Sequence, residues 1–334
     1  MTNKALGEDA ARATAGWTGV VAVDKAKGPT SHDVVQEIRR IFGQRRSGHT
    51  GTLDPLATGL LPVCLGRATR LARFLSGSSK SYRAVVRFGF ATDTYDATGI
   101  RIGRQCDVVL DGEELSAILP SFLGEQQQVP PPFAAKKIQG QRMYRLACAG
   151  IAIEPRPVRV LIRNIRLLAV KGPLATLEVT VESGTYIRSL AHDLGQRMGV
   201  GAHLEELRRM RVGPLSLERS FSLGALEELA RKARLHEAVL APEKALSHLV
   251  ALRLSRAGAA RVAQGRGFLA ADVVEGPGDV QAGQSCRLLG PAGQFLGVGL
   301  VQSAMTGEVR PLVVLCPKEK AAGVEPDSSS GFTG

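Results

Sequence analysis

One carboxylate stands in a loop that is suited to holding a side chain at a fixed angle. Asp54 lies within residues 48–62, GHTGTLDPLATGLLP, which contain three glycines and two prolines. Glycine lets a backbone turn sharply and proline then restricts it, and an ionised carboxylate can act as a nucleophile or a general base. Asp-Pro is also a common turn dipeptide. The nearby His49 and the apolar segment 60–65, which can anchor the loop in a core, favour a functional carboxylate over an ordinary turn.

Two more carboxylates follow in the segment 92–99, TDTYDATG. Asp93 and Asp96 could form an Asx turn, which needs no further function. Together with Asp54, they would also suit hydrolysis of a glycosidic bond or a divalent metal site. The residues alone leave these alternatives open.

Aromatic and basic side chains complete the set of groups that could do chemistry. Tyr82 begins a strand-like segment between Lys80 and Arg83, where it could stack on a nucleobase while the cations bind phosphates, or simply fill the core. In residues 182–195, ESGTYIRSLAHDLG, a strand pattern ends at a glycine and a helix pattern begins, which puts Tyr186 and Arg188 at the junction. His192 and Asp193 lack an elbow serine, and we expect them on the helix surface.

Composition indicates a nucleic-acid partner and argues against most cofactors. The 334 residues include 43 Lys and Arg against 31 Asp and Glu, a net charge of +12 that suits a polyanion, although a generally basic protein is the alternative. The five cysteines form no Cys-x-x-Cys pair, so no zinc site is predicted. The chain has no phosphate-loop or dinucleotide fingerprint. It also has no signal-peptide pattern or membrane-length apolar run, so we expect a cytoplasmic protein.

The elements that must position these groups follow from hydrophobic periodicity. We expect a strand over 19–25 with Lys25 at its end, then a helix to residue 42 with Ser31 as its cap. The basic segment 66–75 is predicted to be helical and to present Arg70 beside the Asp54 loop. Further predicted elements are strands over 83–89, 158–170 and 175–183, a helix over 111–122, a proline-rich turn over 124–132 and a basic helix end over 201–211.

Changes of pattern divide the chain into regions. We expect disordered tails over 1–16 and 317–334, a main domain over 17–248, and a small glycine-punctuated, barrel-like domain over 249–316. Within the main domain, residues of about 126–157 read as an insertion that grips RNA. Its basic residues include Lys136 and Arg145.

Residues 48–62 resemble, without a gap, the catalytic motif of the TruB family of tRNA pseudouridine synthases. Lys80-x-Tyr82 and the segment around Tyr186 and Arg188 resemble the family's second and third motifs. The resemblance implies that Asp54 is catalytic, with Arg188 beside it and Asp96 holding Arg188. It also implies that Tyr82 stacks on the target base and that Tyr186 lies over the uracil.

The same resemblance suggests how RNA is bound. It implies that His49 supports a flipped nucleotide, that Lys25 lies beside the active site, and that residues 126–157 form a thumb-like loop. Lys80, Arg70, Lys136 and Arg145 complete the expected RNA-binding set. The sequence departs from the family at Ala26, where proline is usual, and at Ala134 and Ala135, where a serine is usual.

The resemblance therefore implies an α+β fold with a mixed, mostly antiparallel sheet and a C-terminal PUA-like RNA-binding domain. The implied reaction is isomerisation of uridine 55 in the T loop of tRNA, without cofactor or metal, by a monomer that needs no protein partner. Two other function classes fit the basic surface and the three carboxylates: an RNA-binding module without turnover, and a glycosylase that releases the base.

Overall fold

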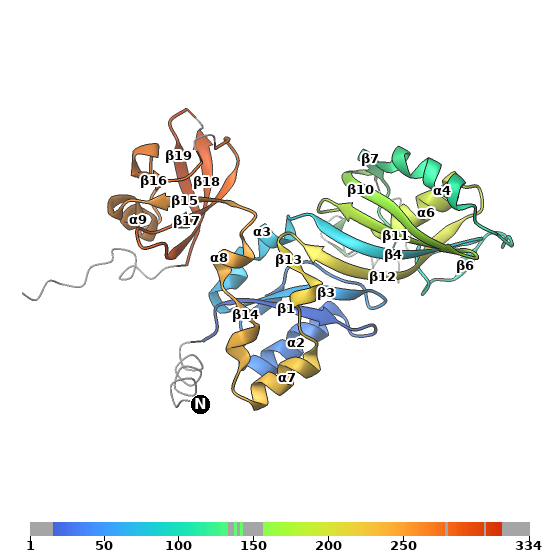
Figure 1. Ribbon diagram of the computed structural model, residues 1–334, viewed down its shortest axis with the longest axis horizontal. Coiled ribbons are helices and arrows are strands. Elements are labelled where there is room, and N and C mark those ends of the chain that lie inside the picture. The colour runs from blue at the N-terminus through green and yellow to red at the C-terminus, as the bar shows by residue number, and fades with distance from the viewer. Residues whose placement is uncertain are drawn as a thin grey trace, which may run out of the picture.

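The computed structural model describes residues 16–132, 137–138, 141–142, 156–277, 280–303 and 305–315. Figure 1 shows a long, twisted sheet with helices against it and a smaller β-rich domain at one end. The predicted α+β class, with a large and mostly antiparallel sheet, is confirmed. The expected terminal tails lie outside the described residues except for Gly16.

The main sheet follows the order β14-β1-β3-β12-β4-β11-β10-β7, with β2 against β3 and β13 against β12. The β3–β12 pair is parallel, and the other neighbours in this order are antiparallel. Their bounds are β1 Gly19–Lys25, β2 Ser47–His49, β3 Thr58–Leu65, β4 Lys80–Phe88, β7 Gly124–Gln128, β10 Val158–Lys171, β11 Leu174–Val181, β12 Ala202–Val212, β13 Leu215–Ser216 and β14 Val239–Leu240.

Helices pack on this sheet through their apolar sides. Val34, Val35 and Ile38 of α2 are buried, as their helical spacing predicts, and α2 lies beside α7 in Figure 1. No helix in the described ranges is long and apolar enough to cross a membrane. The helices are α2 Ser31–Phe42, α3 Ala72–Ser76, α4 Gly112–Ile118, α6 Ile187–Arg197, α7 Leu223–Arg231 and α8 Pro242–Ala245, with 3₁₀ helices η1 Gly66–Leu71, η2 Leu119–Phe122, η3 Leu217–Arg219 and η4 Leu235–Ala238.

The predicted helix end over 201–211 is wrong, because this segment forms strand β12 at the centre of the sheet. Leu204, Leu207 and Met210 recur every three residues, which imitates a helical stripe. Two irregularities interrupt the pairing with β4: the one at 204–206 places Leu204 and Leu207 opposite Val86 and Ala84, and the one at 209–211 leaves Met210 without a partner in this pairing. Each extra residue shifts the alternation of a strand, so the period of two is lost from the sequence.

The start of α2 also differs from the prediction. Thr30, not Ser31, caps the helix, and Asp33 completes a reciprocal capping box with it. The Ser31 hydroxyl is buried and instead binds the backbone of Leu53, donating to its carbonyl at 2.9 Å and accepting from its N–H at 2.8 Å. The residue expected to cap a helix therefore holds the loop that carries Asp54.

The proposed insertion begins later than expected. Residues 126–128 belong to edge strand β7, where Gln128 pairs with Val158. Beyond it, the described backbone comprises the two-stranded ladder β8 Lys137–Ile138 and β9 Gln141–Arg142. Lys136 and Arg145 lie outside the described residues.

Two short strands, β5 Ala91–Thr92 and β6 Arg101–Ile102, pair in a separate hairpin that flanks the Asp96 segment.

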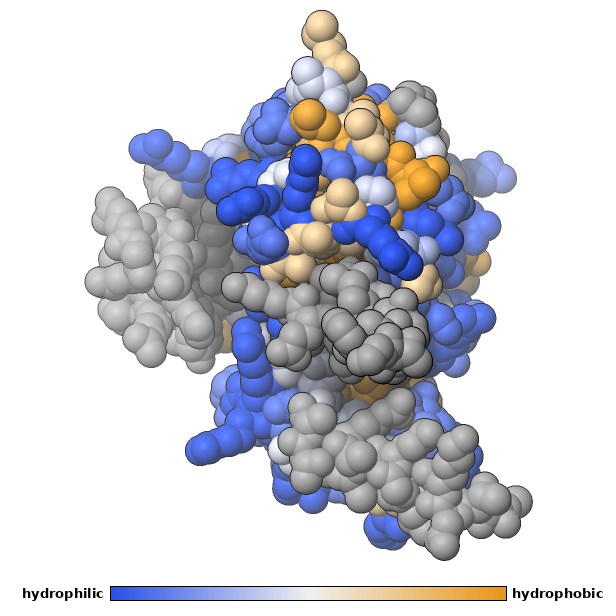
Figure 2. Space-filling view, turned by 90° about the vertical axis from the view of Figure 1, so that its left-hand side faces the viewer, coloured by the Kyte–Doolittle hydropathy of each residue, from blue (hydrophilic) through white to orange (hydrophobic). Residues whose placement is uncertain are grey.

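The C-terminal sheet has the order β16-β15-β17-β18-β19, with the parallel pair β15–β17 at its centre. A bridge between Phe268 and Val309 joins β19 to the segment that leads into β16, so the sheet curls toward a barrel. The side that faces the viewer in Figure 2 shows small hydrophobic groups among hydrophilic residues. The elements are β15 Val250–Leu254, α9 Arg256–Ala263, η5 Ala270–Asp272, β16 Val273–Glu275, β17 Ser285–Leu289, β18 Phe295–Ser303 and β19 Glu308–Val314.

An apolar contact joins the two sheets. Val298, Val313 and Leu315 of the C-terminal sheet share one buried cluster with Leu71 and Leu215 of the main domain. The Arg70 guanidinium also crosses between them, because its Nη1 donates to the Val314 carbonyl at 2.7 Å. Arg70 therefore links the two sheets in this structure, and its contact with RNA stays a prediction.

Gly59 is a position where glycine is required. Its φ is +97°, and a Cβ there would lie 2.4 Å from the Arg209 carbonyl oxygen of the adjacent β12. We predict that Gly59→Ala lowers the free energy of unfolding by about 2 kcal/mol or more, because strain and backbone overlap add. Thermal unfolding checks this. Gly224→Ala in α7, where a Cβ meets nothing within 4 Å, should leave stability unchanged or raise it by less than about 1 kcal/mol; equal effects at the two sites would contradict the prediction.

Candidate active site

A pocket of about 310 Å³ opens at the Asp54 loop, where the ends of several strands meet. Asp54, Tyr82, Tyr186 and Arg188 all line it, so four of the five predicted catalytic residues share one cavity although up to 134 positions separate them in sequence. Asp96, the fifth, contacts the pocket through Arg188. Leu207 and Arg209 of β12 also line the pocket, and the sequence interpretation missed both because it assigned β12 to a helix.

Arg188 is held between two carboxylates. Its Nε lies 3.1 Å from Asp54 Oδ2, and its Nη1 lies 3.3 Å from Asp96 Oδ2. The Arg188 and Asp96 side chains are only 9% and 5% exposed, whereas that of Asp54 is 44% exposed. The buried guanidinium fixes one oxygen of Asp54, while the carboxylate remains open to the pocket.

Asp96 owes its orientation to its own turn. Its Oδ1 accepts from the Thr98 N–H at 2.9 Å and from the Thr98 and Thr94 hydroxyls at 2.5 and 2.8 Å. The Asx turn and the functional role considered from the sequence are thus compatible, because Oδ1 makes the turn and Oδ2 binds Arg188. No group of three or more His, Cys, Asp or Glu residues that could hold a metal occurs in the described part of the chain.

The adjacent Tyr95 ties this turn to α6. Its ring stacks on His192 with centroids 3.9 Å apart and planes at 10°, one helical turn after Arg188. His192 and Asp193 lie on α6 as predicted but are only partly exposed, because the ring of Tyr95 covers His192. Burial lowers the pKa of His192 and raises the pKa of Asp193 to about 6.

The buried ammonium of Lys25 binds the backbone of the Asp54 loop. It is 1% exposed, and its Nζ donates to the carbonyls of Ala57 at 2.7 Å, Ala26 at 2.9 Å and Pro55 at 3.4 Å. Burial lowers the pKa of Lys25, while the negative charge of Asp54 acts in the opposite direction. Lys25 lies beside the site as the resemblance implied, but its buried ammonium binds the loop backbone.

Lys80 and His49 also differ from simple phosphate ligands. Lys80 is 8% exposed and donates to the carbonyls of Ser76 and Ser78, and burial lowers its pKa to about 8. His49 ends β2, and its Nδ1 accepts from the Gly51 N–H at 3.3 Å. Burial, followed by the charges of Arg209 and His32, lowers the pKa of His49 and favours its neutral form. RNA contact by either residue stays a prediction.

Two tyrosines form walls of the pocket. Tyr82 of β4 is buried against the main core, as the core interpretation expected, and also lines the cavity, so its stacking on a base stays a prediction. Tyr186 precedes α6, and burial, reinforced by Asp54 and opposed by Arg188, raises the pKa of its phenol. The side-chain amide of Gln128 binds both backbone groups of Tyr186, accepting from its N–H at 2.8 Å and donating to its carbonyl at 3.1 Å. Nothing in the local sequence around Gln128 indicates this contact, because the two residues lie on different elements.

Comparison with known proteins identifies relatives along most of the chain. Residues 39–187 match the TruB family pseudouridylate synthase N-terminal domain, and residues 188–250 match the tRNA pseudouridylate synthase B C-terminal domain. The tRNA pseudouridine synthase B of Solibacter usitatus is 45% identical over 75% of this chain and 85% of its own length. That of Geobacter sulfurreducens is 42% identical over 81% and 90%. The solved structure of a Cbf5-Nop10-Gar1 complex has a chain that is similar with a TM-score of 0.76 and 26% identity, over 92% of this chain and 88% of that one.

The raised pKa of Asp193 gives a prediction about stability. The native state holds this proton up to about pH 6, whereas the ordinary pKa of an aspartate is 3.8, so the stability contributed by Asp193 is lost as pH rises from about 4 to 6. We expect Asp193→Asn to raise the free energy of unfolding at pH 7 by about 1–3 kcal/mol and to flatten its dependence over pH 4–6. Urea unfolding across this range measures it. Asp107→Asn, at an exposed site, should change stability by less than about 0.5 kcal/mol, and a loss of stability in Asp193→Asn at pH 7 would contradict the assignment.

Proposed function

The chain belongs to the TruB family and is a tRNA pseudouridine synthase, and we propose that it isomerises the uridine at position 55 in the T loop of tRNA. The observation that supports this most directly is the Asp54–Arg188–Asp96 chain in a pocket walled by Tyr82 and Tyr186. Asp54, Tyr82, Tyr186 and Arg188 lie on the three segments that resemble the family motifs, and Asp96 lies on a fourth segment, 92–99.

The reaction breaks the bond between ribose C1′ and uracil N1, rotates the base, and joins C1′ to C5. The C5 proton is lost and N1 gains a proton, so substrate and product are isomers. The reaction therefore needs no cofactor to transfer electrons or chemical groups. We infer that Asp54 supplies the catalytic carboxylate and that Arg188 keeps it oriented. The charge that develops on the ribose and the detached base then meets a positioned group instead of bulk water.

The two tyrosines would hold the base during its rotation. Tyr82 offers a ring for stacking, and Tyr186 places a neutral phenol, whose pKa is raised by burial, within the same cavity. Because the Asp54 side chain is 44% exposed in the free protein, the bound RNA itself must close the pocket. A uridine in a duplex stack cannot reach the carboxylate, so the nucleotide must flip out, with His49 as the residue that supports the flipped conformation.

We further propose that the reaction uses no cofactor or metal, and that the chain acts on tRNA as a monomer in the cytoplasm without a protein partner. The solved relative above was determined with Nop10 and Gar1, whereas the curated relatives carry the name of a single tRNA-modifying enzyme. The C-terminal sheet at 249–316 is proposed to be a PUA-like domain that binds RNA, alongside a catalytic domain over 17–248 with its RNA-gripping insertion. Light scattering with and without tRNA would test the monomer.

One assay separates this function from the other two classes. The protein is incubated with an unmodified tRNA transcript, which is then digested to nucleosides. Pseudouridine at position 55 supports the proposal. An abasic site there would indicate a glycosylase, and tight binding with unchanged bases would indicate a binding module.

Asp54→Asn should abolish pseudouridine formation but leave tRNA affinity within about threefold, because the substitution removes the reacting carboxylate and no phosphate contact. Nucleoside analysis and filter binding measure the two effects. Asp93→Asn is a matched control, because Asp93 accepts a hydrogen bond from the Ile100 N–H and takes no part in the Arg188 ion pairs. The activity of this variant should stay within about threefold of the wild type. Turnover by Asp54→Asn would remove Asp54 from its role.

Arg188→Lys should reduce the single-turnover rate by at least about 100-fold and change the free energy of unfolding by less than about 1 kcal/mol. Lysine keeps the positive charge but cannot bridge Asp54 and Asp96 with two separate nitrogens. Rapid-quench kinetics and urea unfolding provide the measurements. An unchanged rate would show that the bridge is dispensable.

A further inference from the structure

Arg209 is the largest of the side chains that are fully buried, with 1% of its surface exposed. It lies on β12, where its backbone pairs with Gly59 of β3 on one side and with Tyr82 of β4 on the other. This single residue therefore stands between the strand that carries the stacking tyrosine and the strand that follows the Asp54 loop.

The guanidinium of Arg209 binds the backbone on both sides of Asp54. Its Nη2 donates to the Gly51 carbonyl at 3.1 Å and its Nη1 lies 3.5 Å from the Thr52 carbonyl, while its Nε donates to the Leu60 carbonyl at 2.7 Å. Two of these acceptors precede Asp54 in the loop and the third, Leu60, lies in β3 just after the loop; together they match the fixed fork of a guanidinium. The start of the Asp54 loop and the strand that follows it are thereby tied to β12.

Burying the charged guanidinium of Arg209 costs more free energy than packing alone would justify. In the described part of the chain no carboxylate forms an ion pair with Arg209. Burial first, and the charge of Arg209 in addition, lowers the pKa of Lys25, of Lys80 and of His49, which surround the loop. A buried cation without a partner charge destabilises a fold unless hydrogen bonds compensate. An apolar side chain of similar volume would fill the space at lower cost, so the hydrogen bonds to the loop are the specific contribution of Arg209.

We propose that Arg209 is a positioning residue for the isomerisation: by binding the carbonyls of the loop before and after Asp54, it holds the carboxylate in register with Arg188 and with the Tyr82 wall of the pocket. The inference rests on the proposed function of this site. Because the Arg209 side chain is buried beneath the loop, it acts on the rate of the chemical step and not on the affinity for RNA.

The experiment compares Arg209→Met, which keeps length but removes charge and hydrogen bonds, with Arg209→Lys, which keeps the charge but loses the fork. Single-turnover rates at saturating tRNA are measured alongside tRNA affinity and thermal unfolding. We expect a rate loss of about 100-fold in Arg209→Met and about 10-fold in Arg209→Lys, with tRNA affinity within about threefold of the wild type in both.

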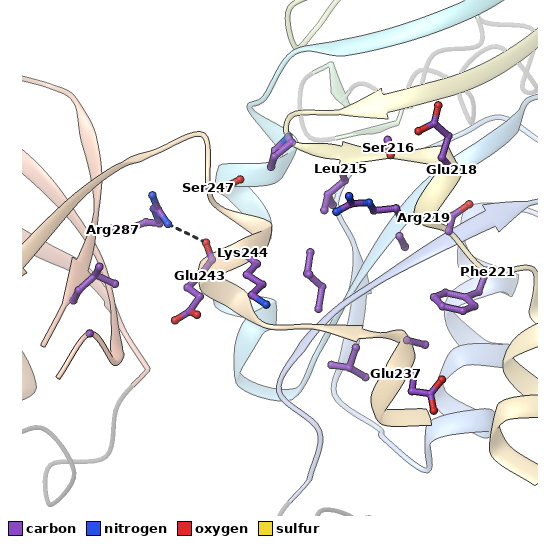
Figure 3. Close-up of a pocket in the computed structure, with 18 residues that line it drawn as sticks. Leu215, Ser216, Glu218, Arg219, Phe221, Glu237, Glu243, Lys244, Ser247 and Arg287 are labelled. Atoms are coloured by element: carbon purple, nitrogen blue, oxygen red, sulfur yellow. Dashed lines mark hydrogen bonds between the residues drawn. The ribbon is translucent and has the colours of Figure 1, made fainter. Parts of the chain in front are cut away.

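The control removes a carbonyl-bound arginine far from Asp54. Arg287 on β17 donates to the Leu249 carbonyl at 2.9 Å and lies 3.4 Å from the Glu243 carbonyl, beside the cavity between the two sheets in Figure 3. Arg287→Met should lower the unfolding temperature yet leave the single-turnover rate within about threefold. The comparison separates a general loss of stability from a specific loss of rate.

The outcomes are distinct. If Arg209→Met does not fold, Arg209→Lys decides, and a wild-type rate in that variant overturns the proposal. The proposal is also overturned if Arg287→Met, at the same loss of stability, loses as much rate as the Arg209 variants. It is likewise overturned if the Arg209 variants lose only tRNA affinity and keep the wild-type rate. Graded rate loss with retained affinity supports it. Absence of pseudouridine with the wild type would instead refute the proposed function, independently of Arg209.

Discussion

The structure depends on one buried guanidinium shared by two carboxylates. Arg188 is almost wholly removed from water, and such a charge is tolerated only where its donors are satisfied. Asp96 satisfies it from a buried turn, and Asp54 satisfies it from an open pocket. Because the buried pair is rigid, the exposed partner is oriented without being enclosed. A carboxylate that is both fixed and accessible is what bond cleavage at a flipped nucleoside requires.

The rest of the main domain serves to bring these three residues together and to keep them in place. Asp54 arrives on a loop, Asp96 on a turn after β5, and Arg188 in the first turn of α6. Side chains then bind the backbone of these segments: Ser31 and Lys25 bind the Asp54 loop, and Gln128 binds Tyr186. Loops are ordinarily the mobile parts of a fold. Here buried polar side chains supply the hydrogen bonds that a regular strand or helix would have made internally.

The buried cations explain why this site is costly to build. Lys25, Lys80 and Arg209 all place positive charge in the interior around the Asp54 loop, where burial opposes it. Lys25 and Arg209 donate to carbonyl oxygens at the two ends of the loop, and Lys80 donates to those of Ser76 and Ser78, so the backbone around Asp54 gains rigidity from interactions that contribute little net stability.

The sequence by itself determined strands β1, β4, β10 and β11, because apolar alternation acts locally. Asp54 could be singled out from its glycine- and proline-rich loop, whereas the roles of Tyr82, Tyr186 and Arg188 and the α+β class were implied by the resemblance of short segments to family motifs. Tertiary structure decided what holds those residues. Bulges in β12 erased its period of two and hid Arg209, and the contact between Gln128 and Tyr186 joins elements 58 positions apart. Lys25 and Lys80 could be interpreted from the sequence as RNA ligands, but the structure buries both. Burial is a property of the packed chain, and the spacing of residues does not reveal it.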